Sequence, residues 1–170
     1  MPSSKLQLAH RVVHMVHQVR PHASILDVGP GWGKYGVLLR EYLDGIERLE
    51  AVEAWEPYVT PMLRAIYDKV WTDDVLAFSP SSLAQYDVVL MVDVIEHMEK
   101  GDALALLARI PGTVVICTPV EFFQNPEADE IPPERHRSVW SVQEFKQLGA
   151  DKAFEELGGV LARLPNGRRR

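Results

Sequence analysis

A glycine-rich segment that follows an apolar stretch constrains this chain more than any other feature. The stretch 24–28 is mostly apolar and carries Asp27 near its end, and glycines follow at positions 29, 31, 33 and 36. This pattern predicts a buried strand that breaks into a tight turn ahead of a helix. In such a turn the backbone approaches a ligand where any Cβ would clash. The segment therefore predicts a ligand site at the end of the strand.

The spacing is compatible with more than one interpretation. Gly31, Gly33 and Gly36 have the spacing of dinucleotide-binding loops, in which a helix N-terminus holds a pyrophosphate. The Asp27 carboxylate would repel that pyrophosphate, and it therefore favours a positively charged ligand. A tight strand-to-helix connection without any ligand is a further alternative.

Together with Asp27, the pattern Gly29-x-Gly31-x-Gly33 resembles the first motif of the class I S-adenosylmethionine (SAM)-dependent methyltransferases. SAM carries a sulfonium and an α-ammonium group, so an acid at the strand end suits it. The resemblance implies that this turn seats the methionine end of SAM. The residues implied are Asp27, Gly29, Pro30, Gly31 and Gly33.

The next predicted strand, 48–53, ends at Glu53. In nucleoside-binding α/β folds, an acid at this place accepts hydrogen bonds from both ribose hydroxyls. Glu50 and Glu56 are the alternatives, and Glu53 is favoured because it directly follows an apolar pair. The predicted nucleoside contacts are Glu53, Ala54 and Trp55.

The segment 69–76 predicts a third strand followed by an acid. The pair Asp74-Val75 resembles the acid–hydrophobic pair that reaches the adenine amino group in these methyltransferases. Asp73 is the alternative because the two acids are adjacent, and either acid could instead cap a following turn. We therefore predict that Asp74 and Val75 bind the adenine.

The segment 86–92 is apolar at nearly every position, which predicts a central parallel strand covered on both faces. The following stretch 93–97 resembles the end of the family's fourth motif, which places Asp93 against the methionine part of SAM and the transferring methyl group. We expect Glu96 and His97 to order this loop through hydrogen bonds. We predict no metal site, because no further ligand accompanies this pair at helical spacing.

The remaining segments complete the pattern. Residues 112–118 predict a fifth strand, and the stretch 121–134, rich in proline and acids, predicts a long loop of the kind that reads substrates. Ser141 and Glu144 have capping-box spacing for a helix that Gly149 would end.

Two further patterns lie near the C-terminus. His136-x-Ser138-x-Trp140 resembles a segment of some members of the family, without an assigned chemical role. Segments 153–157 and 160–164 flank Gly158-Gly159, which predicts a hairpin with these two residues as its turn.

The resemblance implies an α/β fold: a Rossmann-like, doubly wound, mostly parallel seven-stranded sheet with a C-terminal antiparallel hairpin and helices on both faces. We predict one domain over 1–170, with an N-terminal covering helix at 3–20, a Rossmann-like core at 21–164 and a tail at 165–170. The helix is amphipathic, and three histidines are predicted to lie on its solvated side: His10, His14 and His17.

Composition narrows the function classes. A chain of 170 residues with 46% hydrophobic residues suits one domain. The net charge of −6, with no basic patch outside the C-terminal Arg168-Arg169-Arg170, makes nucleic acid an unexpected partner. No segment resembles a membrane span or a signal peptide. The single cysteine, Cys117, suits a reducing cytoplasm. The oligomeric state stays open.

The resemblance implies methyl transfer from SAM to an oxygen or nitrogen acceptor, leaving S-adenosylhomocysteine (SAH). We expect a small-molecule acceptor. The donor is already activated, so the protein mainly positions the reactants and excludes water. A hydroxyl or ammonium acceptor must lose a proton, and the candidate bases are His136, His97 and Glu121. The alternatives are a catalytically silent SAM-binding module and an NAD-dependent oxidoreductase.

Overall fold

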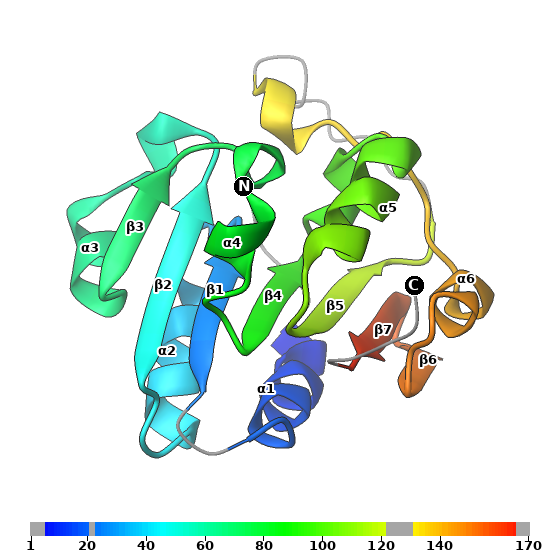
Figure 1. Ribbon diagram of the computed structural model, residues 1–170, viewed down its shortest axis with the longest axis horizontal. Helices are drawn as coiled ribbons and strands as arrows, with labels where there is room; N and C mark the ends of the chain where they lie inside the picture. The colour runs from blue at the N-terminus through cyan, green and yellow to red at the C-terminus, as the bar shows by residue number, and fades with distance from the viewer. Residues whose placement is uncertain (1–5, 21–22, 122–130, 166–170) are drawn as a thin grey trace.

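The computed structural model describes residues 6–20, 23–121 and 131–165. Its strands are β1 (Ser24–Val28), β2 (Arg48–Glu53), β3 (Lys69–Thr72), β4 (Val88–Val92), β5 (Thr113–Pro119), β6 (Lys152–Glu156) and β7 (Gly159–Leu164). They form one seven-stranded sheet in the order β3-β2-β1-β4-β5-β7-β6 (Figure 1). The first five strands are parallel, and β7 runs antiparallel to both β5 and β6. The predicted sheet is therefore confirmed.

Helices cover both faces of this sheet. They are α1 (Ala9–His17), α2 (Lys34–Tyr42), α3 (Pro61–Ile66), α4 (Pro80–Leu83), α5 (Lys100–Arg109) and α6 (Val142–Gln147). Short 3₁₀ turns join them: η1 (Leu6–Leu8), η2 (Glu56–Tyr58), η3 (Val75–Ala77), η4 (Ile95–His97) and η6 (Pro132–Glu134). Side chains of α1, α2 and α3 pack in one apolar cluster, and those of α4, α5 and α6 pack in another. The two clusters are the two halves of a doubly wound core.

The central strand β4 shows why the sheet is covered twice. Its residues alternate between the clusters: Val88, Leu90 and Val92 face the α1–α3 side, while Val89 and Met91 face the α4–α6 side. All five are buried. A strand with apolar side chains at consecutive positions is buried on both sides only when helices cover both faces of the sheet.

The C-terminal hairpin differs from the prediction by one residue. Glu156 pairs with Gly159, so Leu157 and Gly158 form the turn, with φ values of 50° and 73°. Positive φ at both turn residues is the geometry that follows the twist of a two-residue hairpin. Gly159 belongs to β7 instead, because it pairs with Pro119 and Glu156. A Cβ at this position would lie 2.6 Å from Leu8 Cδ1, which accounts for the glycine.

The N-terminal helix is shorter than the predicted range 3–20. It covers Ala9–His17 after η1, and residues 3–5 lie outside the described part. Pro21 disfavours helical backbone at Arg20, which argues against the predicted helix end at residue 20. Within the described ranges, none of the helices is long and apolar enough to cross a bilayer.

Candidate functional site

The carboxyl ends of β1, β2, β4 and β5 surround a cavity of about 790 Å³. Sites for small molecules occupy roughly 300–1,000 Å³ and form in open α/β sheets where the strand order reverses, here between β1 and β4. The lining includes the predicted cofactor residues Asp27, Gly29, Pro30, Gly31, Glu53, Ala54, Trp55, Asp74, Val75 and Asp93, together with His97 and His136. The fold thus collects residues that are far apart in the sequence.

Two predicted site residues lie outside this lining. Gly33 is the N-cap residue of α2 with φ 79°, and a Cβ there would come within 2.7 Å of Ile66 Cδ1. Close packing of α2 against α3 therefore accounts for this glycine. Glu121 is exposed beyond the end of β5, and it is not among the residues that line the cavity.

The turn after β1 brings the backbone to the edge of the cavity. Gly29 and Gly31 have φ values of 62° and 53°. The Gly29 amide donates to the Val52 carbonyl at 2.9 Å, which ties the turn to β2. A Cβ on Gly29 would lie 2.7 Å from Val94 Cγ2. Only glycine allows this turn to approach the loop after β4 so closely.

Asp27 is 2% exposed and accepts a hydrogen bond from the Tyr67 hydroxyl at 2.5 Å. Burial raises the pKa of Asp27 to about 7; the bond from Tyr67 opposes this rise, and the charge of Glu53 adds to it. Burial and the charge of Asp27 raise the pKa of Tyr67, so its hydroxyl remains the donor. A positively charged ligand would favour the ionised form of Asp27.

Glu53 ends β2 with a carboxylate held by the neighbouring backbone. Its side chain is buried, and Oε1 accepts a hydrogen bond from the Trp55 amide at 2.8 Å. Burial raises the pKa of Glu53, while the backbone amides of Trp55, Gly31 and Ala54 lower it. The carboxylate is therefore positioned by the protein at the cavity wall.

The two alternatives to Glu53 have other surroundings. Glu50 accepts hydrogen bonds from Trp71 Nε1 at 2.8 Å and from the Tyr86 hydroxyl at 2.7 Å. Glu56 is exposed in η2. Neither lines the cavity, so the geometry favours Glu53 over both.

Asp73 and Asp74 both line the cavity and both are exposed. Oδ1 of Asp74 accepts from the Leu76 amide at 2.8 Å and caps η3, and Oδ1 of Asp73 accepts from the Asp74 amide at 2.8 Å. The capping role considered for these acids is present. Which of the two would bind adenine stays a prediction.

The loop after β4 carries Asp93 and Glu96 into the other end of the cavity. Asp93 has a φ of 52°, a left-handed conformation, and its amide donates to the Cys117 carbonyl at 2.8 Å. Glu96 is 2% exposed, and its Oε2 accepts a hydrogen bond from the Thr118 hydroxyl at 2.9 Å. Burial raises the pKa of Glu96 to about 8, and the charge of Asp93 adds to this rise.

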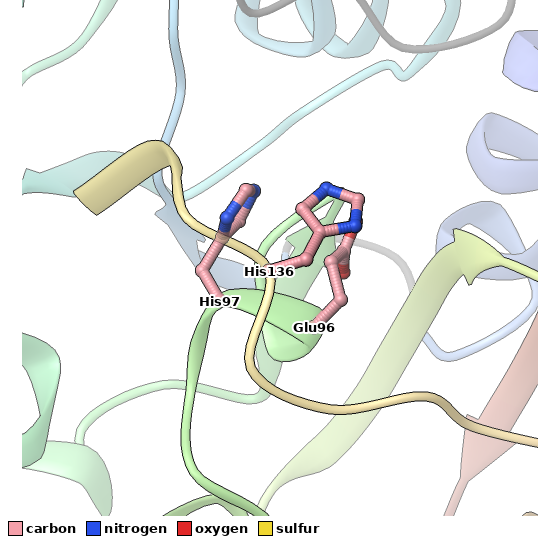
Figure 2. A group of neighbouring side chains, drawn as sticks. All are labelled: Glu96, His97 and His136. Atoms are coloured by element: carbon pink, nitrogen blue, oxygen red, sulfur yellow. The ribbon is translucent and has the colours of Figure 1, made fainter. Parts of the chain in front are cut away.

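Two histidines stand beside Glu96. The rings of His97 and His136 lie 4.8 Å apart and nearly perpendicular, at 80° (Figure 2). Burial lowers the pKa of both imidazoles, and the nearby His97 lowers that of His136 further. Both rings therefore favour the neutral form, which can accept a proton or bind a metal.

Hydrogen bonds explain how a residue from a distant segment reaches this place. The Glu96 carbonyl accepts from the amides of Arg137 and Ser138 at 2.7 and 3.0 Å. The Ser138 hydroxyl donates to the Ile95 carbonyl at 3.2 Å and accepts from Trp140 Nε1 at 2.9 Å. This segment is thereby docked on η4.

The His136-x-Ser138-x-Trp140 pattern thus acquires a structural role. Trp140 is 1% exposed and stacks on Phe145 at 5.3 Å, so it anchors the segment in the core. The sequence alone also gave no role to Tyr67 and Thr118, which hold Asp27 and Glu96. Their partners are distant in sequence, and no local pattern could have identified them.

Comparison with known proteins supports the same fold. No protein-family model and no curated protein matches the sequence. Among solved structures, the N-methyltransferase NodS from Bradyrhizobium japonicum WM9 in complex with SAH superposes with a TM-score of 0.65 at 14% identity, covering 95% of this chain and 87% of that one. The magnesium protoporphyrin IX methyltransferase ChlM from Synechocystis PCC 6803, with bound SAH, has a TM-score of 0.65 at 14% identity, covering 92% and 81%.

A third similar structure is a small RNA methyltransferase, HEN1. It has a TM-score of 0.71 at 15% identity, covering 99% of this chain but 27% of that one, so this chain corresponds to only part of HEN1. The sheet order, the antiparallel hairpin and these superpositions agree. The chain therefore has the Rossmann-like fold of the class I SAM-dependent methyltransferases.

Proposed function

We propose that this protein is a SAM-dependent methyltransferase. The observation that carries the proposal is the position of Glu53: a buried carboxylate at the end of β2 that faces the same cavity as the Gly29–Gly31 turn. In this arrangement Glu53 would accept hydrogen bonds from the ribose hydroxyls, and the turn would approach the methionine end.

The charges of the cavity wall support a cationic nucleoside rather than a pyrophosphate. The lining contains acids at both ends, among them Asp27, Asp73 and Asp93, whereas its lysine and arginine side chains are Lys34 and Arg137. A dinucleotide would place its pyrophosphate beside Asp27 and meet repulsion. The sulfonium and ammonium of SAM would meet attraction.

The acceptor would bind at the other end of the cavity, beside Glu96, His97 and His136. We expect a small molecule, and its reacting atom would be an oxygen or a nitrogen. Several acids in the lining would repel the sugar–phosphate backbone of a nucleic acid, although one of the similar structures is an RNA methyltransferase. If the acceptor loses a proton on transfer, His136 and His97 are the groups positioned to take it. A cytoplasmic location suits the buried thiol of Cys117.

Isothermal titration calorimetry with SAM, SAH and NAD tests the cofactor. We expect binding of SAM and SAH and no measurable binding of NAD. Binding of NAD alone would instead support an oxidoreductase and would refute the proposal.

A screen with labelled methyl groups against hydroxyl, amine, carboxyl and RNA acceptors tests turnover. We expect transfer to a small hydroxyl or amine acceptor. Transfer to RNA would keep the enzyme class and overturn the acceptor. SAM binding without transfer to any class of acceptor would favour the silent SAM-binding module.

A further inference from the structure

Two buried polar atoms at the η4 end of the cavity have no hydrogen-bond partner among the described residues. They are Oε1 of Glu96 and Nδ1 of His97. Glu96 is 2% exposed, and an unpaired polar group at such depth costs on the order of 1–3 kcal/mol, with more for a charged group. A bound water or ion is one explanation for an unpaired buried polar group in a native fold.

A third side chain completes a set of metal ligands. Within the described residues, ligand atoms of Glu96, His97 and His136 all lie within 4.8 Å of one another. Figure 2 shows Glu96 and His97 extending from η4 toward His136, which enters from the neighbouring segment. Bonds to an ion of about 2.0–2.2 Å at tetrahedral angles place two ligand atoms about 3.3–3.6 Å apart, so these side chains would have to rotate toward one another to bind one ion.

The surroundings of the cluster are those of a supported site. The Thr118 hydroxyl donates a hydrogen bond to Oε2 of Glu96, and Oε1 is left without a hydrogen bond. Ser138 and Arg137 bond to η4 through their backbone amides and so hold His136 in place. Outer contacts of this kind orient ligands in known metal sites. Asp93 adds a negative charge that would favour a cation.

We propose that Glu96, His97 and His136 bind one divalent transition-metal ion at the acceptor end of the cavity. One carboxylate and two imidazoles are a ligand set for Zn²⁺, Co²⁺ or Mn²⁺, whereas Mg²⁺ and Ca²⁺ prefer oxygen ligands throughout. Three protein ligands leave a position open toward the cavity. When the ion is bound, both histidines serve as ligands and neither is available as a general base.

The prediction from sequence that no metal binds rested on ligands at helical spacing. That criterion does not detect His136, because this residue comes from a separate segment. Contacts of Ser138 and Trp140 hold the segment against η4. Metal binding does not itself depend on methyl transfer. Only the placement of the ion beside an acceptor rests on the proposed function.

Titration of the metal-free full chain with Co²⁺ tests the site, with visible absorption and equilibrium dialysis as readouts. We expect one Co²⁺ per chain, displaced by Zn²⁺ and not by Mg²⁺. The variants Glu96→Gln and His136→Asn should weaken Co²⁺ binding at least about tenfold, since even outer partners of a metal contribute about 10- to 100-fold. The double variant His10→Asn/His14→Asn is the matched control, because these histidines are exposed on α1 and do not line the cavity.

Each outcome decides the proposal. Binding that survives in both cluster variants and disappears in the α1 double variant would place the metal on the helix and overturn the site. Absence of Co²⁺ binding to the wild-type chain would also overturn it. SAM affinity is measured in parallel. Co²⁺ binding without SAM binding would support the metal site and refute the proposed function. SAM binding without Co²⁺ binding would support the proposed function and refute the metal site.

Discussion

The two halves of the cavity are built in different ways. The glycine-turn half comprises Asp27, the Gly29–Gly31 turn, Glu53, Asp73 and Asp74. Each of these lies in the last residues of a strand or in the turn after it, and backbone amides hold several of the side chains. The histidine half comprises Asp93, Glu96, His97, Thr118 and His136. It combines the ends of β4 and β5 with a segment that precedes α6.

The two halves depend on different kinds of contact. A strand end and the turn after it can place a carboxylate with few long-range contacts, because the parallel sheet already aligns the strand ends. The histidine half depends on hydrogen bonds between segments far apart in sequence, such as those from Ser138 to η4. We therefore expect changes in the two halves to separate cofactor binding from events at the acceptor end.

The largest expected effect comes from Glu53→Ala. If Glu53 accepts two charge-assisted hydrogen bonds from ribose, its loss should weaken SAM binding by about 4 kcal/mol, which is several hundred-fold. Calorimetry measures this directly. Glu56→Ala is the control, since Glu56 is exposed in the same loop and lies outside the cavity lining. A Glu53→Ala protein that binds SAM with wild-type affinity would show that Glu53 does not hold the ribose.

The second effect concerns Asp27 and pH. Its pKa in the folded protein is about 7, above the ordinary value of 3.8, so the folded state holds this proton more tightly than the unfolded state does. The stability that this provides is complete below about pH 4 and is lost as the pH rises through about 7. Asp27→Asn keeps an acceptor for Tyr67 without the charge.

The difference in unfolding free energy between Asp27→Asn and wild type should therefore grow by on the order of 3 kcal/mol between about pH 4 and pH 8. Urea denaturation of the ligand-free proteins at several pH values measures it. A difference that stays constant with pH would show that burial does not hold the proton on Asp27. In that case a cationic ligand would have no proton to displace from Asp27 when it binds in the glycine-turn half.

The elements that a single local pattern determines are predictable from the sequence. The apolar strand β4, the end of β2 at Glu53 and the capping box at Ser141 are confirmed. Gly33 illustrates a limit, because the same residue type serves a ligand turn and a close helix packing. Its contact with Ile66 is visible only in three dimensions.

The histidine half shows a second limit. Nothing near Glu96 in the sequence indicates that His136 lies beside it, since the docking of that segment depends on Trp140 entering the core. Oε1 of Glu96 is likewise buried without a hydrogen-bond partner, and the elements that bury it are far apart in the sequence. Sequence patterns describe neighbours along the chain, and this half is made of neighbours in space.

The third prediction tests where the halves meet. Gly29→Ala should cost about 2 kcal/mol of unfolding free energy, because it combines a positive φ with a Cβ placed 2.7 Å from Val94 Cγ2. Adding Val94→Ala should recover the steric part of this loss. Gly101→Ala is the control: nothing lies within 4 Å of its Cβ position in α5, so the protein should gain about 0.5 kcal/mol. Additive effects of the Gly29 and Val94 changes would mean that the halves are not in steric contact.

The smallest expected effect is the most specific for the histidine half. Ser138→Ala removes the donor to the Ile95 carbonyl and the acceptor of Trp140 Nε1, so we expect a loss of about 1 kcal/mol in urea denaturation. Because the variant loosens only the segment that carries His136, Co²⁺ affinity should fall while SAM affinity stays within about twofold. Val139→Ala, a change in the adjacent exposed side chain, should leave both affinities unchanged. If Ser138→Ala weakened SAM and Co²⁺ binding equally, the cavity would act as one unit, and its division into two independently built halves would be wrong.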